Sequence, residues 1–253
     1  TTFTGGADPA TNLQSLELVR LANNDLSEVL DFAALPNLAW VALNGNPRLF
    51  SSRDAETTRQ LLPRVRWSEV DFGAAPEHLG SGASGVVRAA TWNGRRVAVK
   101  RLQDRGSDGR AADEVRTSDA LFATDAARGV RSLVQTYAVL EPDAEEAQYG
   151  LVMELLPRGV RDLAKPPTIL EITRDRYGPD DRFSPRFAAT VLADLCRALA
   201  FLHSRRLAHG DVYAHNTLVL PEQDCDVDCV KLGDLGAAFA YDADHDAVEH
   251  VEV

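Results

Sequence analysis

The side chains best suited to chemistry lie late in the sequence, where two aspartates and an asparagine occur at fixed spacing. Asn216 follows Asp211 by five positions, and Asp234 ends a short apolar run that is typical of a β-strand. A carboxylate such as that of Asp211 can accept or orient the proton of an attacking hydroxyl. Oxygen donors such as those of Asn216 and Asp234 suit a hard cation that neutralises phosphate charge. The three residues are therefore candidates for acid–base chemistry and for holding a metal.

A glycine-rich segment predicts a site for the phosphates themselves. Gly80, Gly82 and Gly85 follow the pattern G-x-G-x-x-G, with Ser81 inside it and an apolar pair that ends at Val87 behind it. The same letters occur in dinucleotide-binding turns, but those turns need a helix directly after the glycines. A strand-like run follows here instead. We therefore expect a strand-turn-strand flap whose backbone N–H groups can approach phosphate oxygens.

A lysine on the following strand can reach the same phosphates. The pair Asn93-Gly94 lies between two strand-like runs and predicts a two-residue hairpin. On the second run, Ala98 and Lys100 share one face because side chains alternate along a strand. The alternative interpretation of Lys100 is a surface lysine that extends its ammonium group into solvent. Its spacing from the glycine flap favours a pairing with phosphate.

These motifs together resemble the protein-kinase family. Six elements occur in the family's order: the glycine loop at 80–87, Val-Ala-Val-Lys at 97–100, Glu114, the apolar strand at 149–156, His-Gly-Asp at 209–211 with Asn216, and Asp-Leu-Gly at 234–236. The resemblance implies an α+β, two-lobed kinase-like fold and an ATP-dependent phosphotransferase that uses Mg²⁺. It implies that Asp211 orients the acceptor hydroxyl, which is a serine or threonine of a protein substrate, and that Asn216 and Asp234 hold the metal.

The nucleotide contacts implied by the resemblance lie under the glycine flap and along the connector between the lobes. Lys100 would hold the α- and β-phosphates and would be oriented by Glu114, with Asp113 as a neighbouring alternative. Met153 would occupy the gatekeeper position, although the same run also fits a plain core strand. The full set of implied nucleotide contacts is Gly80, Ser81, Gly82, Gly85, Val87, Ala98, Lys100, Met153, Glu154 and Leu156.

Two positions depart from the pattern of most protein kinases. Gly210 occupies the position at which many kinases have an arginine that binds a phosphate on the activation segment. Tyr213 occupies the position at which serine/threonine kinases usually have a lysine. After Asp234 there is no serine or threonine, and Tyr241 is the only hydroxyl, so we expect no switch by phosphorylation there. Three alternatives stay open: an ATP-binding scaffold without transfer, a small-molecule kinase of the aminoglycoside or choline type, and a repeat-based interaction protein.

The front of the chain carries two copies of one pattern. The second copy follows the first by 22 positions: Leu13, Leu16, Val19, Leu21 and Asn24 match Leu35, Leu38, Val41, Leu43 and Asn46. This period and spacing are typical of leucine-rich repeats, in which the asparagine bonds turn backbone. Two chance amphipathic stretches are the alternative. Because two repeats cannot bury a core alone, we expect either capping by the next domain or further repeats before Thr1.

These patterns divide the sequence into three parts. We expect a leucine-rich-repeat segment of the α/β solenoid type at 1–52, a short helix and linker at 53–67, and a kinase-like domain at 68–253. The N-lobe would span about 68–156 and a partial C-lobe about 157–253. The sequence ends soon after Asp-Leu-Gly, so we expect a fragment or a reduced family member. The combination resembles bacterial and algal leucine-rich-repeat kinases and implies a protein partner for the repeats.

A long helix is expected to support the candidate catalytic loop. The stretch at 165–182 is rich in proline and charged residues and is interpreted as a loop insertion. Ser184 and Pro185 then predict a helix start, with serine as the N-cap and proline at the first helical position. Apolar residues at helical spacing follow as far as Leu202.

Composition limits the remaining classes. The net charge of −11 at pH 7 opposes general binding to nucleic acid, whose phosphates are also negative. No run of 18 or more apolar residues occurs, so we expect no membrane span. Three cysteines, an odd and low number, favour a reducing, cytoplasmic setting over a disulfide framework. Cys225 and Cys229 are interpreted as ordinary loop residues rather than as half of a metal site.

Overall fold

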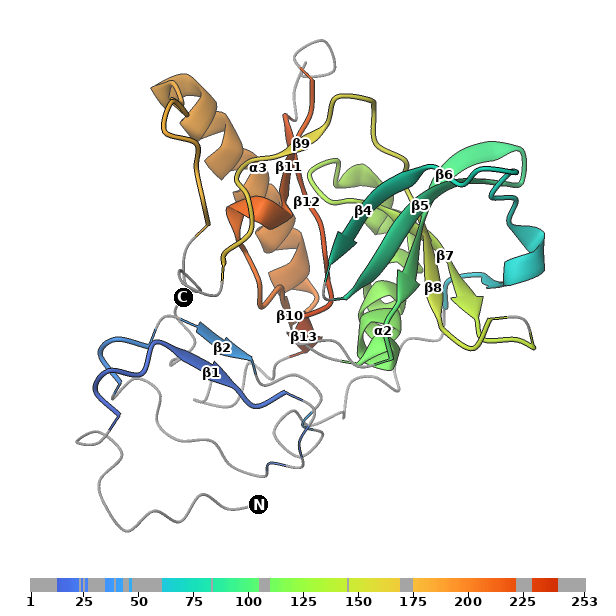
Figure 1. Cartoon of the computed structure of the whole chain (residues 1–253), viewed down its shortest axis with the longest axis horizontal. Helices are drawn as coiled ribbons and strands as arrows, with labels where there is room; N and C mark the ends of the chain where they lie inside the picture. The colour runs from blue at the N-terminus through green and yellow to red at the C-terminus, as the bar shows by residue number, and fades with distance from the viewer. Residues whose placement is uncertain are drawn as a thin grey trace.

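The computed structural model describes a front segment and a two-lobed domain. The described residues are 13–22, 24, 26, 35–38, 40–42, 46, 61–82, 84–104, 110–144, 146–168, 175–221 and 229–240. Figure 1 shows a sheet-rich first lobe beside a second lobe that is built around one long helix. This arrangement agrees with the two-lobed α+β fold expected from the sequence.

The first lobe is a six-stranded sheet with one long helix against it. In spatial order the strands are β3 (Arg64–Arg66), β7 (Thr136–Glu141), β8 (Gly150–Met153), β6 (Arg95–Leu102), β5 (Gly85–Trp92) and β4 (His78–Gly82). Neighbouring strands are antiparallel except β3, which runs parallel to β7. The helix α2 (Ala111–Phe122) shares a buried core with residues of β6, β7 and β8.

Alternating burial along β6 separates the two faces of this sheet. Val97 and Val99 are buried in a core that also holds residues of β5, β7 and β8. Lys100 therefore points to the opposite face, toward α2. The hairpin before β6 is also present: Asn93 and Gly94 both have positive φ, 50° and 72°, as a two-residue turn of this kind requires. The predictions for this strand pair are confirmed.

The second lobe consists of α3 and short strands. Its elements are β9 (Arg161–Asp162), α3 (Pro185–Ser204), β10 (Leu207–Ala208), β11 (Thr217–Val219), β12 (Val230–Leu232) and β13 (Phe239–Ala240). β11 lies between β12 and β9, and β10 pairs with β13, all antiparallel. The described 3-10 helices are η3 (Trp67–Glu69), η4 (Asp125–Gly129) and η5 (Ala214–Asn216). β11 follows Asn216 and β12 precedes Asp234, so their antiparallel pairing brings these two residues near each other.

The start of α3 follows the predicted capping pattern. Ser184 Oγ accepts the N–H of Phe187 at 3.1 Å, and Pro185 is the first helical residue. The described part of the expected insertion at 165–182 contains an isolated antiparallel bridge between Lys165 and Arg176. The start of α3 could therefore be predicted from the local sequence at Ser184 and Pro185.

By length and composition alone, α3 could cross a membrane. Helices of folded domains pass the same test, so the contacts of α3 carry more information. Asp194, in the middle of the helix, is fully buried, and its Oδ2 accepts the N–H groups of Cys229 (2.8 Å) and Val230 (3.0 Å). A buried carboxylate that is bonded to β12 in this way fixes α3 within the second lobe.

Two short strands of the front segment pair with the offset of the sequence repeat. β1 (Leu18–Arg20) runs parallel to β2 (Trp40–Ala42), and Val19 lies opposite Val41. The turns before the strands also correspond: Leu16 N–H donates to Leu13 O at 3.0 Å, and Leu38 N–H donates to Leu35 O at 3.1 Å. The two copies of the pattern thus adopt equivalent local structures in their described parts.

The two asparagines of the pattern both bond backbone. Asn46 is buried; its Nδ2 donates to Leu21 O at 2.8 Å, and its Oδ1 accepts the N–H of Leu26 at 3.1 Å. Asn24 is exposed and donates to Leu21 O at 2.9 Å and to Ala22 O at 3.1 Å. Asn46 therefore bonds backbone of the preceding copy, including the buried N–H of Leu26.

The first lobe begins earlier in the chain than the sequence analysis expected. The linker expected at 53–67 ends in β3 and η3, and β3 is the edge strand beside β7. Val65, the one apolar residue of β3, is buried between two arginines that are exposed. Three residues with a single apolar position give too weak a pattern to predict a strand. The rest of the expected helix and linker, 53–60, lies outside the described residues.

Candidate active site

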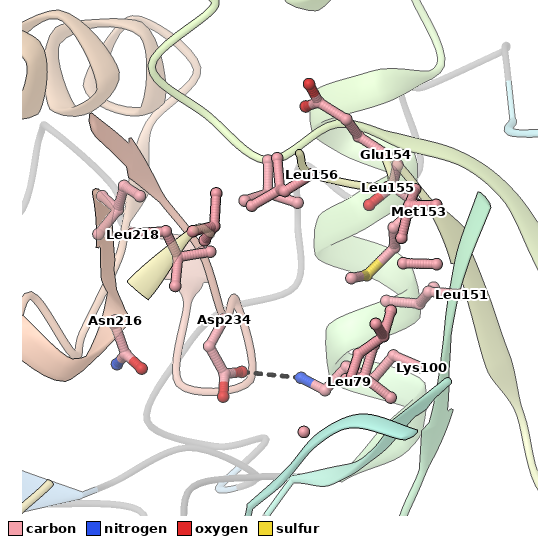
Figure 2. A pocket seen from close by; sticks show the side chains of 18 of the residues that line it. Leu79, Lys100, Leu151, Met153, Glu154, Leu155, Leu156, Asn216, Leu218 and Asp234 are labelled. Carbon is pink, nitrogen blue, oxygen red and sulfur yellow. Dashed lines mark hydrogen bonds and ion pairs between the residues drawn. The ribbon is translucent and has the colours of Figure 1, made fainter. Parts of the chain in front are cut away.

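Lys100 lies where three elements meet. β6 carries Lys100, α2 carries Glu114, and the loop after β12 carries Asp234, which faces Lys100 in Figure 2. Lys100 Nζ is 2.6 Å from Glu114 Oε1 and 2.8 Å from Asp234 Oδ1. Lys100 and Glu114 are buried, whereas the Asp234 side chain is 37% exposed. The structure thus joins three residues that the sequence analysis singled out, across a separation of up to 134 positions.

Glu114, and not its neighbour Asp113, is the partner of Lys100. Asp113 lies on another side of α2, where its Oδ2 accepts the N–H of Arg110 at 3.4 Å and its carboxylate pairs with Arg116. The alternative that the sequence left open is therefore resolved in favour of Glu114.

Burial and charge act against each other in this cluster. Burial alone would lower the pKa of Lys100, but Glu114 and Asp234 outweigh it and hold that pKa above its usual range. Burial alone would raise the pKa of Asp234, but Lys100 above all holds it below its usual range. Burial raises the pKa of Glu114, and the attraction of Lys100 offsets that only in part. Lys100 therefore stays a cation at neutral pH beside an ionised Asp234.

Asn216 and Asp234 can present oxygen atoms to one metal ion. Asn216 Nδ2 donates to Asp211 Oδ2 at 2.7 Å and to Asp211 O at 3.0 Å. Because a carboxylate only accepts, the amide nitrogen faces Asp211, and Figure 2 shows the amide oxygen on the side of Asp234. Asp234 has a φ of 54°, which is unusual for a residue with a side chain, and such strain is concentrated at functional sites.

The donor set fits a metal that also binds phosphate. Within the described ranges, no group of three or more His, Cys, Asp or Glu side chains could hold a metal ion. Mg²⁺ commonly takes one or two protein oxygens and completes its shell with phosphate and water. Cys225 lies outside the described residues, so the interpretation of Cys225 and Cys229 as ordinary loop residues stays a prediction.

A cavity of about 1090 Å³ opens beside these groups. Of the predicted nucleotide contacts, the residues that line it are Gly80, Val87, Ala98, Lys100, Met153, Glu154 and Leu156. Apolar side chains that the sequence analysis did not name, Leu79 and Leu218, line it as well (Figure 2). Leu218 lies on β11, two residues after Asn216, and this closeness in sequence could have indicated it. An apolar slot next to charged groups suits a flat base joined to phosphates.

The other three predicted glycine-loop residues lie outside the cavity lining but shape the flap. Gly82 and Gly85 pair at the end of β4 and β5, and Ser81 lies opposite Val86. A Cβ on Gly85 would lie 2.2 Å from the carbonyl oxygen of Arg101, so only glycine fits there. Within the turn between β4 and β5, Ser84 Oγ donates to Asp234 Oδ2 at 3.0 Å. The flap is thus held directly over the candidate metal ligand.

Gly210 is required by the path of the chain. Its φ is 76°, and a Cβ at this position would lie 2.3 Å from the carbonyl oxygen of Ala237. An arginine would therefore displace the segment after Asp234 as well as strain its own backbone. This gives a physical reason for the departure from the arginine found in many kinases.

His209 fixes the backbone on the other side of Gly210. The ring is buried, with Nε2 3.0 Å from the carbonyl oxygen of Gly233, and Nδ1 accepts the N–H of Asp211 at 3.3 Å. These partners require a neutral ring with its proton on Nε2. Burial lowers the pKa of His209 to about 4, against 6.5 in an exposed histidine.

We expect His209 to make the free energy of unfolding depend on pH. Between pH 6.5 and about 4 the unfolded chain binds a proton at His209 that the folded chain does not. Its contribution is therefore complete above pH 6.5 and is lost as the pH falls to 4, by about 3 kcal/mol in total. Urea unfolding at several pH values should show a shallower dependence for His209→Gln, while His78→Gln, at an exposed site, should keep the wild-type dependence. Equal profiles for all three proteins would contradict this account.

Asp175 was missed by the sequence analysis. Its Oδ2 accepts the N–H of Ala214 at 2.6 Å, and its Oδ1 lies 2.6 Å from His215 Nδ1. The ring of Tyr213 packs on that of His215, with centroids 5.4 Å apart. A residue of the post-connector loop thus holds η5, which precedes β11 and contains Asn216. The signal was absent because Asp175 lies 40 positions from its partner, in a loop without periodicity.

These features define a class before any comparison is made. The domain has two lobes, with a glycine flap and a fixed lysine on one and two oxygen donors and a carboxylate on the other. Such a site can hold a nucleotide polyphosphate with a metal and place a hydroxyl near its end.

Comparison with known proteins gives the family. Residues 74–252 match the protein kinase domain family. The chain is 29% identical over 163 residues to the probable serine/threonine-protein kinase zyg-1 of Caenorhabditis briggsae. It is 26% identical over 192 residues to the serine/threonine-protein kinase mos of Gallus gallus. It is 30% identical over 180 residues to the probable L-type lectin-domain containing receptor kinase S.5 of Arabidopsis thaliana.

The family match covers most of the chain, so the chain belongs to the protein kinase domain family. The three alignments cover 64%, 72% and 70% of this chain, but 20%, 52% and 24% of the relatives. The chain thus spans about half the length of these relatives or less. The sequence-based assignment to the kinase superfamily is confirmed.

Proposed function

We propose that the domain is a protein kinase that transfers the γ-phosphate of ATP to serine or threonine hydroxyls of a protein substrate. The observation that carries the proposal is the Lys100 ammonium, 2.6 Å from Glu114 and 2.8 Å from Asp234 beside a cavity of about 1090 Å³. Two of the relatives described above are named serine/threonine-protein kinases, which supports this acceptor class.

In this proposal the nucleotide lies under the β4–β5 flap. The base occupies the apolar part of the cavity between Ala98 and Leu218, and the backbone near Glu154 and Leu156 bonds its edge. Lys100, held by Glu114, directs its charge at the α- and β-phosphates. When bound through Asn216 and Asp234, Mg²⁺ supplies further neutralisation of the phosphate charge.

Asp211 is proposed to prepare the acceptor. His209 accepts its N–H and Asn216 donates to its carboxylate, so its direction is fixed before a substrate arrives. The carboxylate orients the hydroxyl and accepts its proton as the new O–P bond forms. The bond between the β- and γ-phosphates breaks, and its electron pair leaves with ADP.

Transfer of labelled γ-phosphate to peptides tests the proposal. With Mg²⁺ present, we expect label on peptides that contain serine or threonine, and none on matched tyrosine peptides or after chelation of the metal. Label on amino sugars or choline instead of peptides would favour a small-molecule kinase. Binding of Mg·ATP by the protein without transfer to any acceptor would favour a scaffold.

We also propose that the front segment is a pair of leucine-rich repeats that bind a protein partner, as in the bacterial and algal kinases that the sequence resembles. The parallel register of β1 and β2 at the repeat offset supports this proposal, as does the bonding of Asn46 to the preceding copy. The cytoplasmic location expected from the cysteine count remains part of the proposal. Neither nucleic acid nor a membrane has a part in it.

Asn46→Ala tests the role of the repeat asparagine. We expect a loss of about 1–3 kcal/mol in the local stability of the front segment, because the buried N–H of Leu26 loses its bond to Asn46 Oδ1. Asn24→Ala changes the equivalent residue of the first copy, which is exposed, and should cost less than about 1 kcal/mol. Hydrogen exchange of the β1 and β2 amides in the full chain measures both. Equal effects of the two variants would contradict the repeat arrangement.

A further inference from the structure

The segment 61–66 packs on α2 although it precedes the part of the chain that matches the kinase family. That match begins at residue 74. Leu62 is 5% exposed and shares a core cluster with Val115 and Leu121 of α2. β3, which begins two residues after Leu62, extends the sheet beyond β7. The segment is thus part of the packing that holds the helix.

Asp119 of α2 receives three hydrogen bonds from this segment. Leu62 N–H donates to Asp119 Oδ1 at 3.0 Å, and the Arg64 guanidinium donates to Oδ1 at 2.8 Å and to Oδ2 at 2.6 Å. The side chain of Asp119 is only 8% exposed and that of Arg64 is 29% exposed. The hydrogen bond to Asp119 raises the pKa of Arg64, so the guanidinium stays charged. A bidentate contact of this kind fixes both the distance and the angle between the guanidinium and the carboxylate.

The same helix presents Glu114 to Lys100 from a different side. Asp119 follows Glu114 by five positions, which is a rotation of about 140° and a rise of about 7.5 Å along a helix. Arg64 is itself anchored to the sheet edge, because it donates to Leu62 O at 3.1 Å and lies 3.5 Å from Glu141 of β7. Two ion pairs, one from β6 and one from β3, therefore set the rotation of α2 against the sheet.

We infer that Arg64 and Asp119 are positioning residues that hold α2 in the rotation at which Glu114 reaches Lys100. The inference rests on the proposed function, in which the Lys100–Glu114 pair directs the phosphates. Without Arg64, the Asp119 carboxylate would be buried without its charge partner, and α2 would shift to hydrate it. Glu114 would move with the helix. Catalysis thus depends on residues that lie before the family match.

Three single variants of the full chain test this. Arg64→Ala removes the guanidinium, and Asp119→Asn removes the charge but keeps an acceptor for the Leu62 N–H. Arg66→Ala is the matched control, because Arg66 lies on the same strand, is 76% exposed and pairs with Glu69. We expect the first two to lower kcat for peptide phosphorylation about tenfold and to weaken Mg·ATP binding about fivefold, with Arg66→Ala within about twofold of wild type.

A double-variant cycle separates positioning through Glu114 from a general loss of stability. In a Glu114→Gln background, Arg64→Ala or Asp119→Asn should lower kcat by less than about twofold, because the pair they position is already broken. A further tenfold loss would overturn the inference, as would single variants with wild-type kcat and nucleotide affinity. If Arg64→Ala shows no cooperative thermal unfolding, Asp119→Asn decides by the same two results.

Failure of the proposed function would look different. A wild-type chain that binds Mg·ATP but transfers no phosphate would contradict the kinase proposal. Nucleotide affinity would then replace kcat in the cycle, with the same pattern expected. In that case, wild-type Mg·ATP affinity in both Arg64→Ala and Asp119→Asn would be enough to overturn the inference.

Discussion

Asp211→Asn is expected to slow phosphate transfer to a peptide hydroxyl by about 10²- to 10⁴-fold while Mg·ATP affinity stays within about twofold of wild type. The amide cannot take up a proton, but its oxygen can still accept from Asn216 Nδ2, which donates to the Asp211 carboxylate at 2.7 Å. Asp211 is also not among the residues that line the cavity, so the nucleotide contacts are unchanged. Single-turnover transfer and equilibrium nucleotide binding measure the two effects separately.

A second aspartate controls for the loss of charge. Asp180→Asn removes one negative charge from an exposed position in the same lobe and should leave both quantities within about twofold of wild type. An Asp211→Asn protein with the wild-type transfer rate would show that another group orients the hydroxyl. Parallel loss of transfer and of nucleotide affinity would instead place Asp211 in the nucleotide site through Asn216.

Lys100→Met is expected to lower transfer by about 10²- to 10³-fold and also to weaken Mg·ATP binding. The change removes the cation that lies between Glu114 and Asp234, so the two carboxylates face the phosphates without it. Weaker Mg·ATP binding distinguishes Lys100→Met from Asp211→Asn, which should leave Mg·ATP affinity unchanged. Transfer within about threefold of wild type would contradict the role given to Lys100.

The stability of the Lys100 variant needs its own control. Glu114 is buried, and removal of its cation leaves a carboxylate that is costly to keep charged, by about 3–5 kcal/mol. Lys100→Met combined with Glu114→Gln should recover much of that free energy of unfolding without any recovery of transfer. Recovery of transfer together with stability would show that the single variant failed through folding.

The residues that sequence reasoning could find are those whose local pattern already fixes their direction. Alternation along a strand placed Lys100 on the face opposite Val99, and the structure agrees. The choice between Asp113 and Glu114 could not be made, because both lie in the first turn of α2 and no local signal says which side meets the sheet. That choice depends on how a helix docks, which is a tertiary property.

Contacts between distant loops were not predictable for the same reason. Asp175 and Asp119 bond partners 40 and 55 positions away, and no local sequence pattern marks either pairing. β3 was missed because three residues with one apolar side chain carry almost no strand signal. Gly210 was recognised as a departure, but its cause, the close approach of the Ala237 carbonyl, belongs to a second loop.

The repeat pattern in the front segment shows the opposite case. A period of 22 positions in the sequence predicts which residues lie opposite one another if the copies stack, and Val19 does lie opposite Val41. Periodicity constrains long-range pairing because every copy adopts the same local backbone structure. Leu43, one position of the pattern, lies outside the described residues.

The most direct test of the account is an experimental structure of the chain with Mg²⁺ and a non-hydrolysable ATP analogue. We expect the metal to bind Asn216 Oδ1, Asp234 and phosphate oxygens, with Lys100 Nζ on the α- and β-phosphates and the base between Ala98 and Leu218. A triphosphate bound away from Lys100, or a metal without Asp234 among its ligands, would contradict the central claim that these groups form one nucleotide site.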